Sequence, residues 1–326
     1  MKKILFLMFV GASFFKLTPS IGQHVVADKE DAEKVKNNPL IVVLMGEDEK
    51  VVSKLTKNPE NLKNYREGIE KYNAYLKDAV EREWKFSQEV VFILPGELEK
   101  VKAERNDRFC QLESAEVRNY KMGDFYSSSS NSGFNSSSDL AYHLSTTANT
   151  NGLAIKWAGS PKNDIVQTYF PAMGLSKGSM TLMIQNLQNQ LEDALINDIT
   201  KISDWKKDAE KRTPELKDKT LLILEETMSN GLTKAIEKGD LGKYYGPKYE
   251  VVNFDQLEKY IIEKDDRYAY TWIIPAGAQS QGKTLYNYFI VDAKDGRFMY
   301  MTGMAVAGAN GQFHHGQLMQ VNKKLK

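Results

Sequence analysis

The strongest constraint on the fold is an internal repeat. The twelve residues LEKVKAERNDRF (98–109) return 159 positions later as LEKYIIEKDDRY (257–268), with six identities and no gap. Upstream, EVVFILPG (89–96) resembles EVVNFD (250–255) after a gap of two residues, and LIVVLM (40–45) resembles TLLILE (220–225). Similar segments in the same order predict that the chain contains two copies of one folding unit.

Each copy has the same expected order of elements. Short apolar runs predict buried strands, and the first is followed by apolar residues at helical spacing from Tyr65 to Val80. A second strand (EVV) and a second helix (LEK) come next, then three strands and a last helix. The sequence therefore predicts an α/β protein with α+β character, a tandem duplication of a β-α-β-α-β-β-β-α unit. Each unit is expected to be a mixed sheet flanked by helices.

The repeat sets the expected domain boundaries. We expect a signal peptide (1–22), an N-terminal linker (23–38), a first α/β repeat (39–197), a charged, helical connector (198–219) and a second α/β repeat (220–326). Residues 127–139 inside the first repeat are a run of Ser, Asn and Gly, a composition that cannot bury a core and predicts a loop.

The N-terminus has the pattern of an export signal. Lys2 and Lys3 precede an apolar run of twelve residues (4–15), and small residues before Gln23 predict cleavage near Gly22–Gln23. The run is too short to anchor a chain in a bilayer, so we expect export to the periplasm or the medium and no membrane span in the mature chain. Cys110 is the sole cysteine, which excludes an intramolecular disulfide and favours a core position.

The balance of charge argues against nucleic acid as a partner. Lys and Arg number 44, Asp and Glu 43, and the net charge is +1. Proteins that bind DNA or RNA usually carry a basic footprint, because they must neutralise phosphates. This chain has none in its overall composition.

One octet, GAQSQGKT, matches the phosphate-binding loop pattern through Gly277, Gly282, Lys283 and Thr284. A working loop of that kind leads from a strand into a helix, whose N-terminus supplies amides to the phosphates. Here TLYNYFIVD follows, and it alternates as a strand does. The sequence therefore predicts a hairpin turn and a false match, with no nucleotide and no other cofactor.

A second match, GLSKG (174–178), has the form of the nucleophile elbow of α/β-hydrolases. Ser176 would be the nucleophile, His314 or His315 the base, and Asp255 or Asp266 the acid. The simpler interpretation is that small residues lead into a helix that Ser176 caps.

Three methionines and two histidines suggest a soft metal site. Met299, Met301 and Met304 lie close to the adjacent His314 and His315 in the sequence, and thioether and imidazole ligands suit Cu(I). Methionines are more common as core residues, so no metal site is expected.

The signal segment, the start at Gln23 and the repeated EVV, LEK and DRF/DRY blocks resemble uncharacterised exported α/β proteins of Gram-negative bacteria. That resemblance implies no activity. We expect an exported, non-enzymatic envelope or secreted protein that binds a protein or glycan partner in the envelope. Two alternatives stay open: a serine hydrolase that uses Ser176, and a protein that binds a small ligand in the cleft between the repeats.

Overall fold

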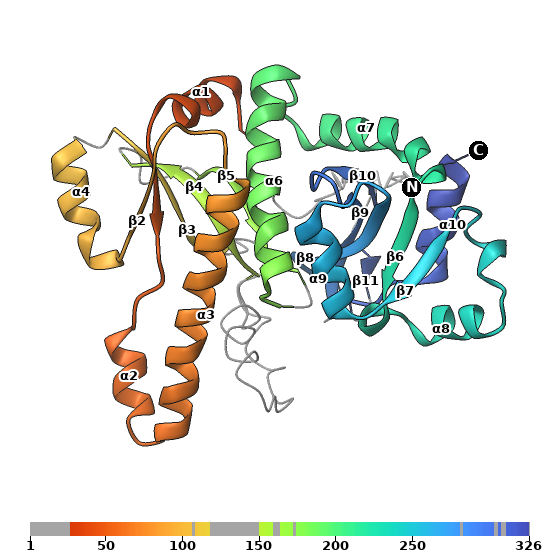
Figure 1. Cartoon of the computed structure of the whole chain (residues 1–326), viewed down its shortest axis with the longest axis horizontal. Coiled ribbons are helices and arrows are strands. Elements are labelled where there is room, and N and C mark those ends of the chain that lie inside the picture. Colours follow the sequence, from red (N-terminus) through yellow and green to blue (C-terminus); the bar gives the residue numbers. More distant parts are fainter. Residues whose placement is uncertain are drawn as a thin grey trace, which may run out of the picture.

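Two mixed sheets lie side by side in the chain, each with helices on both faces (Figure 1). The computed structural model describes residues 27–105, 108–117, 150–158, 164–171, 174–280, 283–302, 306–307 and 311–325. The α/β class and the arrangement in two units, both predicted from the repeat, are confirmed.

Among the described residues, the first sheet has five strands in the order β2-β1-β3-β4-β5. They are β1 (Leu40–Val43), β2 (Val90–Ile93), β3 (Cys110–Val117), β4 (Thr150–Trp157) and β5 (Asp164–Tyr169). β1 runs parallel to both of its neighbours, whereas β3, β4 and β5 are antiparallel to one another. Because β1 is covered on both faces, Leu40 and Val42 enter one core and Ile41 enters the other.

The helices of the first unit cover this sheet unequally. They are α1 (Lys29–Asn37), α2 (Glu49–Leu55), α3 (Pro59–Glu83), α4 (Leu98–Arg105) and α6 (Lys177–Ile196). α1, α3 and α6 bury the larger core, and α4 covers a small core around Phe109 on the opposite face. α3 begins where the Asn58 side chain accepts a hydrogen bond from Asn61 N, with Pro59 at the first helical position.

The second sheet has the same strand order, with one short strand added. Its strands are β6 (Thr220–Leu224), β7 (Tyr249–Val252), β8 (Tyr268–Ser280), β9 (Lys283–Asp292), β10 (Phe298–Met301) and β11 (Val306–Ala307). The order is β10-β9-β8-β6-β7, which is the order of the first sheet read from its other end, and β11 pairs with β9. β6 is parallel to β7 and β8, and the remaining pairs are antiparallel.

In the described part of the chain, four helices that follow α6 cover the second sheet, two on each face. They are α7 (Ile202–Arg212), α8 (Asn230–Glu237), α9 (Phe254–Glu263) and α10 (His315–Lys324). Leu232 of α8 and Leu318 of α10 belong to one core, and Trp205 of α7 and Leu257 of α9 belong to the other. α9 begins at the N-cap Asn253, as the sequence predicts, because the Asn253 side chain accepts from Gln256 N.

The strand registers align the two copies residue by residue. Val90 pairs with Leu40 in the first sheet, and Tyr249, 159 positions after Val90, pairs with Leu221 in the second. The same offset relates Cys110 to its counterpart on β8, so one spacing holds from β2 to β3. The gap of two residues inferred from the EVV letters is therefore wrong. In the first strands, Leu40 is equivalent to Leu221, one position later than the similarity of the letters suggests.

The segments before β1 and β6 each contain a helix, but the two helices cover non-equivalent faces. α1 shares a core with α3, whereas α7 shares a core with α9, the counterpart of α4. α1 lies within residues 23–38 and α7 within residues 198–219, each one helix ahead of the first strand of its unit. The charged segment 198–219 is helical, as predicted, but α7 also contributes to a core. Trp205 is 5% exposed and packs edge-on against Phe298 of β10, with ring centroids 5.4 Å apart.

Cys110 gives a direct probe of the first core. Its side chain is fully buried at the start of β3, and burial raises the pKa of the thiol to about 12. Because the thiolate is the reactive form, we expect no reaction with a disulfide reagent in native protein and complete reaction in denaturant. Labelling that proceeds as fast in native as in unfolded protein would contradict this placement.

Candidate functional site

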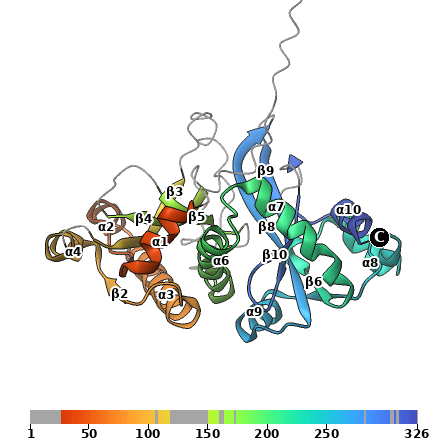
Figure 2. The same ribbon diagram turned by 90° about the horizontal axis from the view of Figure 1, so that it is seen from above.

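Within the described residues, many of the buried polar side chains lie on α6, at the contact between the two units. α6 packs against α1 and α3 of its own unit and against α9 of the second unit (Figure 2). Leu182 of α6 and Tyr169 of β5 belong to the core of the second unit rather than to that of the first. The helix is consequently enclosed, with fifteen of its twenty residues buried.

The N-terminal end of α6 is held by a carboxylate of the second unit. Gly178 N donates to Glu258 Oε2 of α9 at 3.0 Å. A side chain at Gly178 would approach the backbone and side chain of Glu258 to 3.3 Å, so glycine lets the two helices come this close. A negative charge at a helix N-terminus is also favourable to the helix dipole.

The middle of the interface contains a buried carboxylate shared by both units. The Glu83 side chain, on α3, is 3% exposed. It accepts from Gln185 Nε2 of α6 at 3.1 Å, pairs with Arg82 at 2.9 Å, and pairs with Lys264 of the second unit at 2.7 Å. Two cations and an amide thus compensate one desolvated charge, which a buried carboxylate requires.

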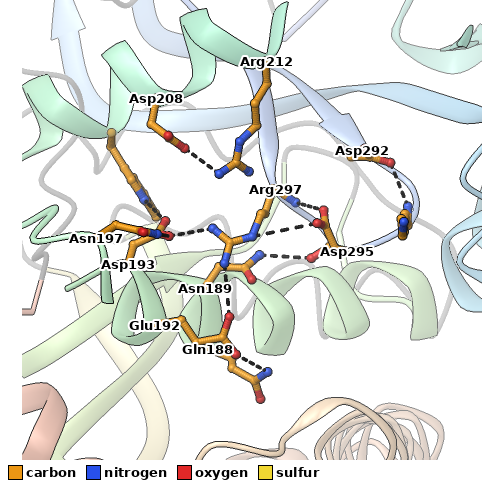
Figure 3. Close-up of polar contacts among 12 residues, drawn as sticks. Gln188, Asn189, Glu192, Asp193, Asn197, Asp208, Arg212, Asp292, Asp295 and Arg297 are labelled. Atoms are coloured by element: carbon orange, nitrogen blue, oxygen red, sulfur yellow. Dashed lines mark hydrogen bonds and ion pairs between the residues drawn. The ribbon is translucent and has the colours of Figure 1, made fainter. Parts of the chain in front are cut away.

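The C-terminal end of α6 carries the densest set of ion pairs (Figure 3). Arg297, on the turn between β9 and β10, donates to Asp193 Oδ1 at 2.6 Å and to Glu192 Oε2 at 3.1 Å. Asp193 also accepts from Trp205 Nε1 of α7 at 3.0 Å and from Asn197 Nδ2. One carboxylate, with its side chain 4% exposed, therefore joins α6, α7 and the β9–β10 turn.

The same turn approaches α6 through its backbone. Asn189 Nδ2 donates to the Asp295 carbonyl at 3.0 Å. Gly296 has a φ of +72°, and a Cβ there would lie 2.5 Å from Gln185 Oε1. Burial lowers the pKa of Arg297, but the hydrogen bond and charge of Asp193 outweigh burial, so the pKa lies above its usual value. The guanidinium stays charged at any physiological pH.

A small cavity lies beside this cluster. It is lined by Asn186, Asn189, Asp193, Trp205, Asp208, Arg212, Gly296, Arg297 and Phe298. Its interior volume is about 10 Å³, enough for about one water molecule. Pockets that take organic ligands measure several hundred Å³, so this cavity is too small to hold one. The arrangement can fix the relative orientation of the two units.

Ser176 is buried and serves as the N-cap of α6. Its Oγ accepts from Ser179 N at 3.0 Å, and Ser179 Oγ accepts from Ser176 N at 2.7 Å. The residue is 7% exposed. His314 is the N-cap and His315 the first residue of α10, which lies on the face of the second sheet opposite to the one that α6 contacts. The His315 ring packs against Tyr244 with centroids 4.8 Å apart. The structure therefore places the candidate nucleophile and base on separate helices.

The described residues of the octet GAQSQGKT lie on the paired strands β8 and β9. β8 extends to Ser280, β9 begins at Lys283, and these two residues pair in antiparallel register, as do Gln279 and Thr284. Lys283 and Thr284 are thus in a strand, not at the start of a helix. Gly277 lies on β8, and Gly282 falls outside the described residues. The local backbone that a phosphate loop needs is not the one found here.

Two of the three methionines lie in different cores. Met299 packs in the core covered by α8 and α10, and Met301 in the core covered by α7 and α9. Residues two apart on a regular strand share a face, which would predict one face for Met299 and Met301. That prediction is wrong, because β10 has a register shift between Phe298 and Tyr300. Met304 lies outside the described residues. Within the described ranges, no group of three or more His, Cys, Asp or Glu side chains is arranged to hold a metal ion.

Sequence patterns missed the residues that make this interface. Asp193 and Arg297 are 104 positions apart, and no local motif links them. One signal was present: between Lys177 and Glu192, α6 carries apolar and uncharged polar residues but no charge. Charged side chains are rarely buried, so a long helix segment without any is expected to be enclosed by other elements.

Comparisons with protein-family models, with curated proteins and with solved structures found no match to this chain. In the described part of the chain, no helix combines the length and apolar character needed to cross a bilayer.

Proposed function

We propose that this chain is an exported, non-enzymatic binding protein of the cell envelope or the extracellular medium. In this proposal, two related α/β units held in one orientation present a composite surface to a protein or glycan partner. The observation that carries the proposal is the interface along α6. There, three carboxylates each form a hydrogen bond or an ion pair with a residue of the other unit, and they belong to Glu258, Glu83 and Asp193. Such an interface supports a fixed surface rather than a moving active-site cleft.

The chemistry of the candidate catalytic motifs supports the same function. Ser176 caps a helix that the second unit covers, and Lys283 is paired in a hairpin strand. A nucleophile must reach a base within hydrogen-bond distance and an open site for its substrate. Ser176 has its base candidates on another helix and is itself buried.

The test compares binding with hydrolysis on the same protein. The purified chain is immobilised, exposed to a detergent extract of the envelope, and any captured protein or glycan is then measured for saturable binding in solution. In parallel, wild type and Ser176→Ala are treated with a fluorophosphonate probe. We expect saturable binding and no labelling. Labelling of the wild type that disappears in Ser176→Ala, together with ester turnover, would replace this proposal by the hydrolase.

Export is tested separately. We expect cell fractionation to place the chain outside the inner membrane and mass spectrometry to find a mature N-terminus near Gln23, because the N-terminal segment has the pattern of a cleaved signal. An intact Met1 in a cytoplasmic fraction would contradict this part of the proposal.

A further inference from the structure

β7 is an open edge of the second sheet. Within the described residues it pairs with β6 alone. Leu221 N of β6 donates to the Lys248 carbonyl, and the parallel ladder then uses the N–H and C=O of Glu250. The backbone groups of Tyr249 and Val251 therefore point away from the sheet, where another strand can bind them.

The charged side chains along this edge are arranged so that two copies of the strand can pair with each other. Lys248 and Glu250 flank Tyr249 and lie on the same face of the strand, since residues two apart share a face. Neither forms an ion pair with any residue in the described part of the chain, and Tyr249 and Glu250 are half-buried. When a second copy of this strand runs antiparallel and is centred on the same residue, the positive charge of each copy comes opposite the negative charge of the other.

We propose that two copies of this chain associate through β7, antiparallel, about a two-fold axis at Tyr249. In that register Tyr249 faces Tyr249 of the second copy and the two residues exchange both backbone hydrogen bonds. Lys248 of each copy then lies directly opposite Glu250 of the other, which gives two cross-strand ion pairs. Opposite charges at such positions stabilise a strand pair, and like charges destabilise it.

Pro247, which precedes Lys248, limits this contact to one short ladder of hydrogen bonds. Pro247 comes opposite Val251 of the second copy, where its carbonyl can accept from Val251 N but its ring nitrogen cannot donate. The two sheets become continuous across the axis. Because the contact is isologous, it closes on itself and gives a dimer rather than a fibre. It also covers an edge that would otherwise be free to pair at random.

The equivalent edge of the first sheet lacks this complementarity. Glu89 corresponds to Lys248 and Val91 to Glu250 by the strand register. Glu89 is already paired with Arg105 at 2.7 Å, and Val91 carries no charge. The two-fold match of charges is thus a property of β7 and not of the shared fold.

The first test uses charge reversal and the oligomeric state of the protein purified from cells that express the full chain. In sedimentation velocity we expect the wild type to dimerise as its concentration rises. Glu250→Lys and Lys248→Glu each place like charges opposite one another twice, so each is expected to raise the dissociation constant at least about tenfold. The double variant restores opposite charges and is expected to dimerise as the wild type does, and Glu89→Lys, the matched change on β2, to have no effect.

The second test fixes the register. Residues that exchange both hydrogen bonds have Cα atoms about 5.5 Å apart, within the range that a disulfide spans. Tyr249→Cys is therefore expected to form a covalent dimer under mild oxidation, whereas Val251→Cys is not, and the buried Cys110 stays reduced. A wild type that is monomeric at every concentration, a Glu250→Lys variant that dimerises as the wild type does, or equal crosslinking at both positions would overturn the proposal.

Discussion

Asp193→Ala is expected to lower the free energy of unfolding by about 3–5 kcal/mol, the usual cost of removing one partner of a buried ion pair. The substitution removes the 2.6 Å contact to Arg297 and the bond from Trp205 Nε1. The mostly buried Arg297 guanidinium then keeps only the longer contacts to Glu192 at 3.1 Å and to Asp295 at 3.8 Å. Chemical denaturation followed by tryptophan fluorescence measures the change.

The matched control is Asp204→Ala on the neighbouring helix α7. Asp204 pairs with Lys207 at 2.8 Å, but the Asp204 side chain is 37% exposed and that of Lys207 70% exposed, and pairs open to solvent in this way contribute little. We expect no change beyond the error of the measurement. Equal losses in the two variants would show that the Asp193 cluster is not the desolvated contact described above.

Gly152→Ala is expected to cost about 3 kcal/mol or more, or to prevent folding, because a well-packed strand pair must separate to admit one methyl group. Gly152, on β4, lies opposite Tyr169 of β5. A Cβ at Gly152 would fall far inside van der Waals contact with the Thr168 carbonyl oxygen, and Thr168 C would lie 3.0 Å away. Thermal unfolding monitored by circular dichroism measures the loss.

Gly68→Ala is the control for this substitution. Gly68 is inside α3, and a Cβ there meets no atom within 4 Å. Alanine in a helix interior is favoured over glycine by about 0.5–1 kcal/mol, so this variant is expected to be slightly more stable than the wild type. A destabilised Gly68→Ala beside an unaffected Gly152→Ala would contradict the packing described for both helix and sheet.

The repeat was sufficient to predict the order of elements. The twelve-residue block 98–109 and its copy 257–268 both cover a helix and the strand after it, α4 with β3 and α9 with β8. Since one unit must bury its sheet in the same way each time, a shared block implies a shared topology. The strand orders of the two sheets agree with that expectation.

The register of the edge strands could not be predicted from matching letters. EVV at Glu89 and EVV at Glu250 are identical, yet the ladder places Val91, not Glu89, at the position of Glu250. An edge strand is half solvated, so its side-chain pattern constrains pairing weakly. Only the hydrogen bonds to β1 and β6 decide the alignment.

The residues of the candidate site could not be predicted from sequence patterns either. GLSKG and GAQSQGKT are local motifs, and both are explained by local structure, a helix cap and a hairpin. The Asp193–Arg297 contact joins residues from different units, so it exists only after both units have folded and docked. No spacing rule describes such a pair, because the separation depends on every loop between its members.

The contacts along α6 hold the two units as one rigid body. The most direct test is an electron spin resonance distance measurement between labels on α4 (Lys100→Cys) and at the end of α8 (Lys238→Cys), which lie at opposite ends of the molecule (Figure 1). Cys110 is buried and stays unlabelled, and dilution with unlabelled chain removes contacts between copies. We predict one narrow distance distribution in the wild type that broadens in Asp193→Ala. A broad distribution in the wild type would contradict the account.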